Sequence, residues 1–338
     1  MNHYTQVAFT ICSNNYLGQA LALKKSFLEH NPSFGFFIVL VDKLSDEIDY
    51  SVFLPAQIIP IDKIKSVNLE DLISRYYIIE LNTSVKPSVF KYLIANNPEV
   101  ESIFYLDPDL YFYSSLNSLN AVLQSKVAVL TPHILSPIPR DGKQPDENTF
   151  FRFGIYNLGF LGVNAKHKES KTLLDWWEER VINFGYDRPN KGYFVDQLWM
   201  TIAPLFFNEI AIENSYGYNM APWNLHERHI LSRDGDTILL NDNSPLVFYH
   251  FSKIAEDKDS VSREYDRFSL QDFPLLKELY LDYKMVLSEC RFSEYKKIPI
   301  AFPVKIPPTK KASPKKASLF SKGLSKLSNL LNQLAKKV

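Results

Sequence analysis

Apolar residues in the first part of the chain form short continuous runs on either side of a longer amphipathic segment. Residues 6–12 and 34–42 (QVAFTIC and FGFFIVLVD) are nearly all apolar, which is typical of strands buried on both faces. Between them, residues 17–31 place apolar side chains at helical spacing and end before Pro32. A strand, a helix and a strand of these lengths predict two parallel strands joined by a right-handed crossover.

The same two patterns continue to about residue 252. The predicted strands cover residues 56–62, 100–113, 126–134, 155–164 (one strand or a pair) and 244–252. The predicted helices cover residues 69–81, 85–98, 170–184 and 194–207, and the segment 137–154 is interpreted as a loop. We therefore expect one α/β domain over residues 1–300, with a mixed, mainly parallel sheet flanked by helices.

The last part of the chain differs in composition. Residues 301–317 form a Pro/Lys-rich linker that cannot bury a core. Residues 318–338 are expected to form a basic amphipathic helix, with Phe320, Leu324, Leu327 and Leu331 along one face. Apolar residues combined with lysine as the charged residue favour binding to an anionic membrane surface, and docking on a partner protein or a second copy is the alternative.

Charge is divided unevenly along the chain. Eleven lysines and no acidic residue lie between residue 295 and the end, so the body holds 27 basic and 38 acidic residues. An acidic body without a helix-turn-helix or base-stacking pattern argues against binding to nucleic acid. A hydrophobic fraction of 46% indicates a folded chain, and no apolar run is long enough to cross a bilayer. Two cysteines without a recognisable spacing indicate a reducing compartment, so we expect a cytoplasmic protein.

Two carboxylates interrupt the most apolar part of the chain. Asp107 and Asp109 flank Pro108 inside VESIFYLDPDLYFY, where a central strand is expected to end. Ligands of open α/β sheets collect at the carboxyl ends of the strands, and carboxylate oxygens suit Mg²⁺ or Mn²⁺. A solvated turn is the simpler interpretation, but it does not explain the apolar residues on both sides. The pattern therefore favours a divalent metal site.

Several motifs along the chain resemble those of GT-A-type glycosyltransferases. The segment FYLDPDLYFY resembles their Asp-x-Asp motif, and TICSNNYLGQALALKKSF resembles their first strand and nucleotide-binding turn. VKPSVFKYLI, YNLGFLGVN, FVDQLWM, YNMAPWNLHER and FYHFS complete the series over roughly residues 5 to 255. The resemblance is closest to bacterial sugar transferases related to the glycogenin-like and lipopolysaccharide galactosyltransferase families. It implies a GT-A, Rossmann-like fold.

The resemblance also implies roles for individual residues. Asp107, Asp109 and His250 would be the metal ligands, although a histidine flanked by apolar residues is often a core residue. The donor-binding residues would be Ser13, Asn15, Tyr16, Lys86, Asp107, Asn157 and Gly159. Related enzymes often carry an acidic residue where Ser13 stands, and Lys91 is an alternative to Lys86 as the phosphate contact.

The remaining implied residues concern the sugar and the acceptor. Asp196 and Gln197 resemble the pair below the anomeric carbon and would be catalytic. Trp223, Asn224 and His226 would shape the acceptor or sugar pocket, and a core role for Trp223 is the alternative. The residues alone do not choose between inversion and retention, whereas the resemblance favours retention.

Together these features predict a metal-dependent hexosyltransferase that uses Mn²⁺ or Mg²⁺. It would move a sugar from a nucleotide-sugar, UDP-linked, to a glycan or lipid-linked acceptor in bacterial surface polysaccharide or glycoconjugate synthesis, on the inner face of the membrane. The alternative is a non-catalytic sugar-nucleotide-binding relative that acts as a membrane-associated scaffold. A nucleotidyltransferase would need a Gly-rich basic loop after the first strand, and CSNNYLGQ is not one.

Overall fold

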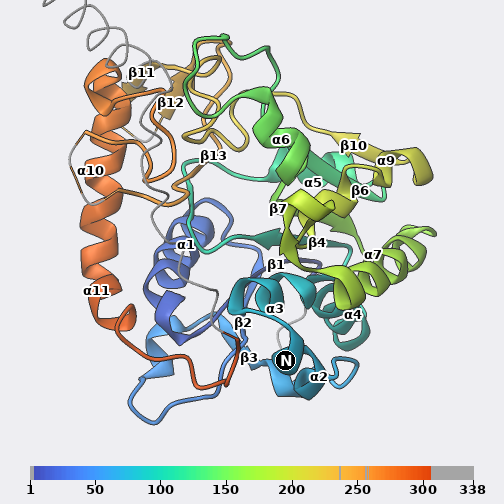
Figure 1. Ribbon diagram of the computed structural model, residues 1–338. Coiled ribbons are helices and arrows are strands. Elements are labelled where there is room, and N and C mark those ends of the chain that lie inside the picture. The colour runs from blue at the N-terminus through green and yellow to red at the C-terminus, as the bar shows by residue number, and fades with distance from the viewer. Residues whose placement is uncertain (1–3, 236, 256, 258, 306–338) are drawn as a thin grey trace, which may run out of the picture. The chain divides into compact units, whose positions relative to one another are not determined.

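The computed structural model describes residues 4–305 except 236, 256 and 258, and its centre is a seven-stranded sheet (Figure 1). The strand order is β10-β6-β7-β4-β1-β2-β3. The strands are β1 (Gln6–Cys12), β2 (Gly35–Leu40), β3 (Gln57–Pro60), β4 (Ser102–Leu106), β6 (Ala128–Pro132), β7 (Tyr156–Asn164) and β10 (Ile210–Ile212). β7 pairs antiparallel with both its neighbours, and the other pairs are parallel. The predicted mixed, mainly parallel sheet is confirmed.

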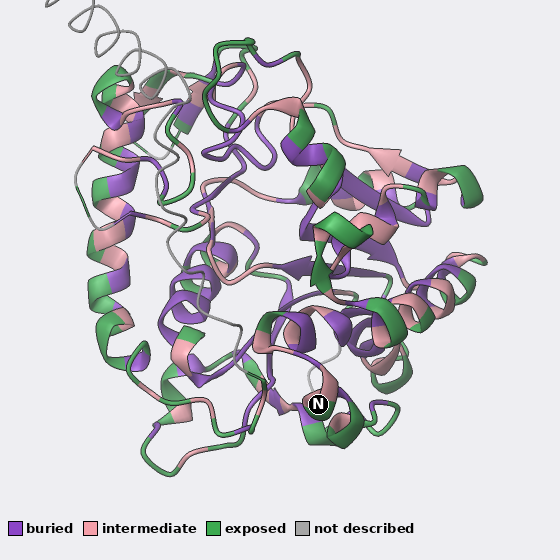
Figure 2. Cartoon of the chain, viewed as in Figure 1, coloured by how far each residue is buried: buried purple, intermediate pink, exposed green. Residues whose placement is uncertain are grey.

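Helices cover both faces of this sheet, which explains why its strands are apolar throughout. Val7, Phe9 and Ile11 of β1 pack in one core with α3 (Ile78–Ser84), α4 (Lys86–Asn96) and α7 (Ser170–Phe184). Ala8 and Cys12 belong to the second core, with α1 (Leu17–His30) and α10 (Pro274–Glu289). Successive residues of a strand point to opposite faces, so a strand covered on both sides has no polar face. Figure 2 shows the central strands almost entirely buried.

Three smaller strand pairs complete the described sheets. β5 (Leu110–Phe112) pairs antiparallel with β13 (Phe248–His250), with His250 opposite Leu110. β11 (Ile230–Asp234) pairs with β12 (Thr237–Leu240), and β8 (Asp187–Arg188) pairs with β9 (Tyr193–Phe194). The first of these pairs matters most for the site, because it brings two segments far apart in the sequence to the end of β4.

Some predicted elements are divided or relocated. The two helical pieces expected over 69–81 and 85–98 are three helices, because Tyr76 and Tyr77 are extended between α2 (Leu69–Arg75) and α3. The predicted loop 137–154 contains α6 (Glu147–Phe153), whose first turn is capped by the Asp146 side chain. The helix expected over 194–207 is two short helices, α8 (Gln197–Met200) and α9 (Ala203–Phe206), since Pro204 begins a new first turn. The unpredicted elements include α5 (Asn117–Leu123) and α11 (Phe292–Tyr295).

The packed body extends beyond the expected boundary at residue 300. The Ala301 N–H donates to Asp42 Oδ1 at 2.9 Å, Phe302 is buried, and the compact unit continues to Lys305. The rest of the predicted linker and the predicted helix 318–338 lie outside the described residues. Within the described part of the chain, every helix is too short or too polar to cross a membrane.

Candidate metal centre and sugar site

The end of β4 places two carboxylates on one turn. The Asp107 N–H donates to Gly159 O at 2.7 Å, and the Leu110 N–H donates to Asp107 O at 3.1 Å, so the chain turns at Pro108 before β5 begins. The Asp109 carbonyl accepts a hydrogen bond of 2.9 Å from the Phe251 N–H, beside β13. The Asp-Pro-Asp segment is therefore held by β7 on one side and by the strand that carries His250 on the other.

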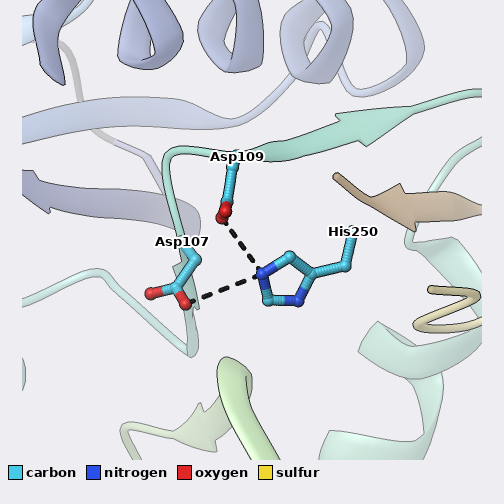
Figure 3. A group of neighbouring side chains, drawn as sticks. All are labelled: Asp107, Asp109 and His250. Carbon is cyan, nitrogen blue, oxygen red and sulfur yellow. Dashed lines mark ion pairs between the residues drawn. The ribbon is translucent and has the colours of Figure 1, made fainter. Parts of the chain in front are cut away.

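His250 completes a group of three side chains at this turn (Figure 3). Its Nε2 atom lies 3.0 Å from Asp109 Oδ1 and 3.9 Å from Asp107 Oδ2. One ligand atom from each of the three residues lies within 4.8 Å of the others. The structure thus brings together the three predicted metal ligands, although His250 and Asp109 are far apart in the sequence.

The donor set fits a hard divalent cation. His250 is buried, whereas the Asp107 and Asp109 side chains remain 30% and 22% exposed, so the group opens to solvent on the carboxylate side. Burial opposes ionisation of Asp109, but the neighbouring His250 holds the pKa of Asp109 below its ordinary value. Burial also disfavours the charged form of His250, and Asp109 outweighs it, so the pKa of His250 is raised. Two carboxylates and one imidazole leave room for further oxygen ligands in an octahedral shell of Mn²⁺ or Mg²⁺.

Gly159 on β7 makes space for this group. A Cβ atom at this position would lie 2.6 Å from His250 Cε1 and 2.8 Å from both Asn157 Oδ1 and Asp107 Oδ2. Asn157 Oδ1 accepts a hydrogen bond from the Gly159 N–H at 3.1 Å, and its Nδ2 lies 3.2 Å from His133 Nε2. Both donor-site residues predicted on β7 therefore lie beside the metal ligands.

Lys86 and Asp196 form a buried ion pair next to Asp107. Lys86 is 2% exposed, and its Nζ lies 2.8 Å from Asp196 Oδ2 and 3.9 Å from Asp107 Oδ1. The same Nζ donates to Leu158 O at 2.9 Å. Burial raises the pKa of Asp196, and the charge of Lys86 opposes this rise. Lys86 does begin α4, as expected, but its charge is directed at Asp196.

Lys91, the alternative phosphate contact, faces elsewhere. Its Nζ lies 2.6 Å from Asp175 Oδ1 and 2.6 Å from Glu178 Oε2, both on α7. These contacts join two neighbouring helices of one layer. Lys91 therefore contributes to the packing of α4 on α7 in this conformation.

Gln197 connects the start of β7 with the end of α6. Its Oε1 accepts a hydrogen bond of 2.9 Å from the Leu158 N–H, and its Nε2 donates to Phe153 O at 2.7 Å. Val195, which precedes Asp196, has a φ of 39°. Such a backbone conformation is rare for a β-branched residue and is found mainly where the surroundings enforce it. Gln197 is thus fixed by two hydrogen bonds to backbone, and Asp196 by its ion pair with Lys86.

The predicted nucleotide-binding turn lies after β1. Ser13 is buried and its hydroxyl donates to Asn15 Oδ1 at 2.6 Å, while Tyr16 is exposed. Desolvation and the charge of Asp109 both raise the pKa of Tyr16. Asn14, which was not predicted, fixes the turn by donating from Nδ2 to Lys43 O at 2.8 Å.

The segment 219–228 packs against His250. The Trp223 ring centre lies 5.1 Å from that of His250 and 5.3 Å from that of His133. Asn224 is fully buried, and its Nδ2 donates to the carbonyls of His133 and Asn219 at 3.1 and 2.9 Å. His226 Nε2 lies 3.1 Å from Ser136 O. Of the three predicted pocket residues, Trp223 contacts the candidate metal ligand His250, and the other two contact backbone carbonyls.

His133 is a residue beside this site that sequence reasoning missed. Burial lowers its pKa to about 3, so the ring is neutral near pH 7. It links Asn157 to Trp223 by the contacts given above. A polar residue immediately after β6 was the available signal, because ligand sites form at the carboxyl ends of strands.

Comparison with solved structures defines the class of fold. The chain superposes on the galactosyltransferase LgtC, solved with donor and acceptor sugar analogs, with a TM-score of 0.51 and 16% identity, covering 84% of this chain and 95% of LgtC. It also superposes on the bifunctional glycosyltransferase WbbM with a TM-score of 0.50 and 12% identity, covering 88% of this chain and 52% of WbbM. The fold is therefore that of the GT-A glycosyltransferases, as the sequence resemblance predicted.

A relative in sequence is an uncharacterised protein. The chain is 27% identical over 278 residues to YfnF of Bacillus subtilis (strain 168), which covers 82% of this chain and 90% of YfnF. No protein-family model matches the chain.

Proposed function

We propose that this chain is a metal-dependent glycosyltransferase that transfers a sugar from a nucleotide-sugar, UDP-linked, to a glycan or lipid-linked acceptor. The observation that carries the proposal is the group of Asp107, Asp109 and His250, which lies at the end of a central strand in a GT-A fold. LgtC, which shares this fold, is solved with donor and acceptor sugar analogs. The setting we propose is bacterial surface polysaccharide or glycoconjugate synthesis.

The cation we propose is Mn²⁺ or Mg²⁺, held by Asp107, Asp109 and His250. When bound, it would supply Lewis-acid stabilisation for the charge on a nucleoside diphosphate leaving group. The orientation of the Asp107 carboxylate is also fixed by a hydrogen bond, which the Tyr105 hydroxyl donates to its Oδ1. Fixed ligand orientation of this kind supports metal binding.

We assign Asp196 to the chemistry of the sugar and Lys86 to the control of Asp196. Lys86 stabilises the buried carboxylate as an anion at 2.8 Å. An anion at this position would stabilise the positive charge that develops at the anomeric carbon in a reaction with retention. Gln197 would position the β7 backbone for this step, because its amide is bonded to Leu158 and Phe153.

The other predicted residues receive binding roles in this proposal. Tyr16, with Ser13 and Asn15, would hold the nucleotide base at the exposed side of the turn after β1. Asn157 and Gly159 would line the donor sugar. Trp223, Asn224 and His226 would support the acceptor pocket, the last two by holding the loop that carries Trp223.

We also propose that the enzyme works in the cytoplasm on the inner face of the membrane. The lysine-rich segment at the end of the sequence would attract it to anionic lipid at about 1 kcal/mol per lysine near the surface. This would bring the site close to a membrane-bound acceptor.

Turnover of nucleotide-sugars tests the proposal. The full chain would be incubated with ¹³C-labelled UDP-sugars and Mn²⁺, and donor cleavage and the anomeric configuration of the product followed by NMR. We expect Mn²⁺-dependent cleavage with retention, and loss of more than about a hundredfold in Asp107→Ala and Asp109→Ala. The exposed Asp62 provides a control, since Asp62→Ala lies outside the site. Undiminished turnover in either ligand variant, or donor binding without any cleavage, would contradict the proposal.

A further inference from the structure

Apolar side chains of α7, α8, α9 and β9 form two partly exposed groups, which we together call the aromatic ridge. Phe184 stacks on Tyr193 with ring centres 6.1 Å apart and lies 6.2 Å from Trp199, and Trp176 lies 5.7 Å from Phe206. The ridge consists of Trp176, Phe184, Tyr193, Trp199, Leu205 and Phe206. Leu205, Phe206 and Phe184 are 76%, 57% and 44% exposed, and Figure 2 shows α9 exposed at the side of the molecule. Exposed apolar surface of this kind marks an interaction site.

Cationic side chains border the aromatic ridge. The Arg180 guanidinium lies 4.9 Å from the centre of the Trp176 ring and is paired with the exposed Glu179 carboxylate at 3.0 Å. Arg188 lies 4.2 Å from the centre of the Tyr186 ring. Lys191, in the turn between β8 and β9, is exposed, as is Asp187. The turn 187–191 therefore has a net charge of +1. Aromatic and aliphatic side chains beside arginine and lysine are the composition of surfaces that lie in a lipid headgroup region.

The ridge adjoins the candidate sugar site through α8. Asp196 and Gln197 lie at the start of α8, and Trp199 of the ridge follows two residues later. Trp177 Nε1 donates to Asp196 O at 3.2 Å, so α7 also contacts the site directly. A surface bound at the ridge would therefore lie near the candidate site.

The described chain ends next to the segment between α2 and α3. Lys305 forms a bridge with Tyr77, next to Tyr76, whose hydroxyl donates to Val181 O at 2.9 Å on α7. The Tyr76 ring lies 5.1 Å from that of Tyr186, which lies 6.3 Å from that of Tyr193 in the ridge. The 33 residues that follow Lys305 contain eight lysines and no acidic residue.

We propose that the aromatic ridge is a lipid-contacting surface that lies on an anionic membrane. An anionic lipid surface complements both the apolar side chains and the cations of the border. The lysine-rich segment 306–338 and a second copy of the ridge would each bring like charge to that border, which disfavours them as occupants. The inference rests on the proposed function in one respect, namely that the acceptor is presented at a membrane.

Vesicle flotation of the full chain tests this inference. Vesicles of phosphatidylcholine alone would be compared with vesicles of three parts phosphatidylcholine to one part phosphatidylglycerol. We expect Leu205→Ser/Phe206→Ser to lower partitioning onto the mixed vesicles by about tenfold or more, because two exposed apolar side chains no longer enter the headgroup region. Leu281→Ser/Met285→Ser is the matched control, because these two side chains are exposed on α10.

A second variant covers the case in which the first one fails to fold. Arg188→Gln/Lys191→Gln changes only exposed side chains, and we expect it to lower binding severalfold on mixed vesicles but not on phosphatidylcholine. Unchanged flotation of both folded ridge variants would overturn the inference. A change in oligomeric state caused by the ridge variant, measured by sedimentation, would also overturn it in favour of contact between copies.

Donor cleavage, measured in parallel, separates the two proposals. We expect both ridge variants to cleave donor as the unsubstituted chain does. Reduced flotation of a chain that never cleaves donor would support the lipid-contacting surface and overturn the proposed function. Normal donor cleavage with unchanged flotation would support the proposed function and overturn the lipid-contacting surface.

Discussion

Replacing Gly159 by alanine should damage the candidate metal site without removing any of its ligands. The added Cβ would lie 2.6 Å from His250 Cε1 and 2.8 Å from Asp107 Oδ2, whereas ordinary contact begins at 3.4 Å. The imidazole would have to retreat by about 0.8 Å and the carboxylate by about 0.6 Å. Metal sites require their ligands within about 0.5 Å of the productive geometry, so both displacements exceed the tolerance.

We expect Gly159→Ala to weaken Mn²⁺ binding by about 10- to 100-fold, the range found when the surroundings of metal ligands are changed. Titration calorimetry with Mn²⁺ measures this affinity directly, and the experiment requires neither the donor nor the acceptor. A thermal melt of the same sample shows whether the variant is folded at the temperature of the titration.

Gly162→Ala, on the same strand, separates damage to the site from general overpacking. Its Cβ would lie 2.7 Å from Val129 Cγ1 and 2.8 Å from Phe104 Cε1, both in the apolar core. Overpacking of this kind costs about 1–3 kcal/mol of stability, so we expect a lower Tm with Mn²⁺ affinity unchanged. Wild-type affinity in Gly159→Ala, or an equal loss in Gly162→Ala, would refute the assignment of Gly159 to the metal site.

The metal ligands, the buried ion pair and His133 each allow a separate measurement. Mn²⁺ should raise the Tm of the wild type, and Asp109→Asn should abolish that rise; a rise of equal size in the variant would exclude Asp109 as a ligand. Lys86→Met should cost about 3 kcal/mol in urea unfolding, because it leaves the buried Asp196 without its partner. Lys91→Met removes only a partly exposed pair and should cost less than about 1 kcal/mol. Equal losses of stability in Lys86→Met and Lys91→Met would contradict the importance of the buried Lys86–Asp196 pair. Burial lowers the pKa of His133 to about 3 in the folded state. Below about pH 6.5 the folded state therefore binds fewer protons than the unfolded state, so the free energy of unfolding falls as the pH is lowered from 6.5. From pH 7 to pH 5 the wild type should lose about 2 kcal/mol more than His133→Gln, and identical losses would show that His133 does not titrate in this way.

Local patterns were sufficient for the regular elements of the fold. Helix α7 runs over Ser170–Phe184, the same range that the amphipathic spacing predicts, and β1 over Gln6–Cys12 matches its apolar run. In both cases the signal lies within the element itself, because burial sets the period of the apolar side chains. The same spacing is present in α10, where Leu276, Leu279, Tyr280, Tyr283 and Leu287 are buried, although this helix was not among the predicted elements.

Elements that depend on distant partners could not be predicted in this way. β10 has three residues and exists because it pairs with β6, which lies about eighty residues earlier. α6 is seven residues long, and its sequence signal is limited to the Asp146 cap. In the site, the pairing of His250 with Leu110 in the β5–β13 ladder brings the histidine to Asp109. No local pattern contains that register, and only the family resemblance suggested it.

Helix geometry explains why Lys86 and Lys91 could never serve the same ligand atom. Five residues at 3.6 per turn rotate the side-chain direction by about 140°, so two lysines with this spacing point to different sides of a helix. One faces Asp196 beside the metal group, and the other faces Glu178 on α7. The sequence therefore contained enough information to separate the two lysines, but it could not say which side of α4 faces the site. That choice depends on how α4 packs against β7, whose Leu158 carbonyl accepts a hydrogen bond from Lys86. A buried cation in this position neutralises Asp196 from within the protein, which would leave the partly exposed oxygens of Asp107 and Asp109 to the divalent cation that we propose.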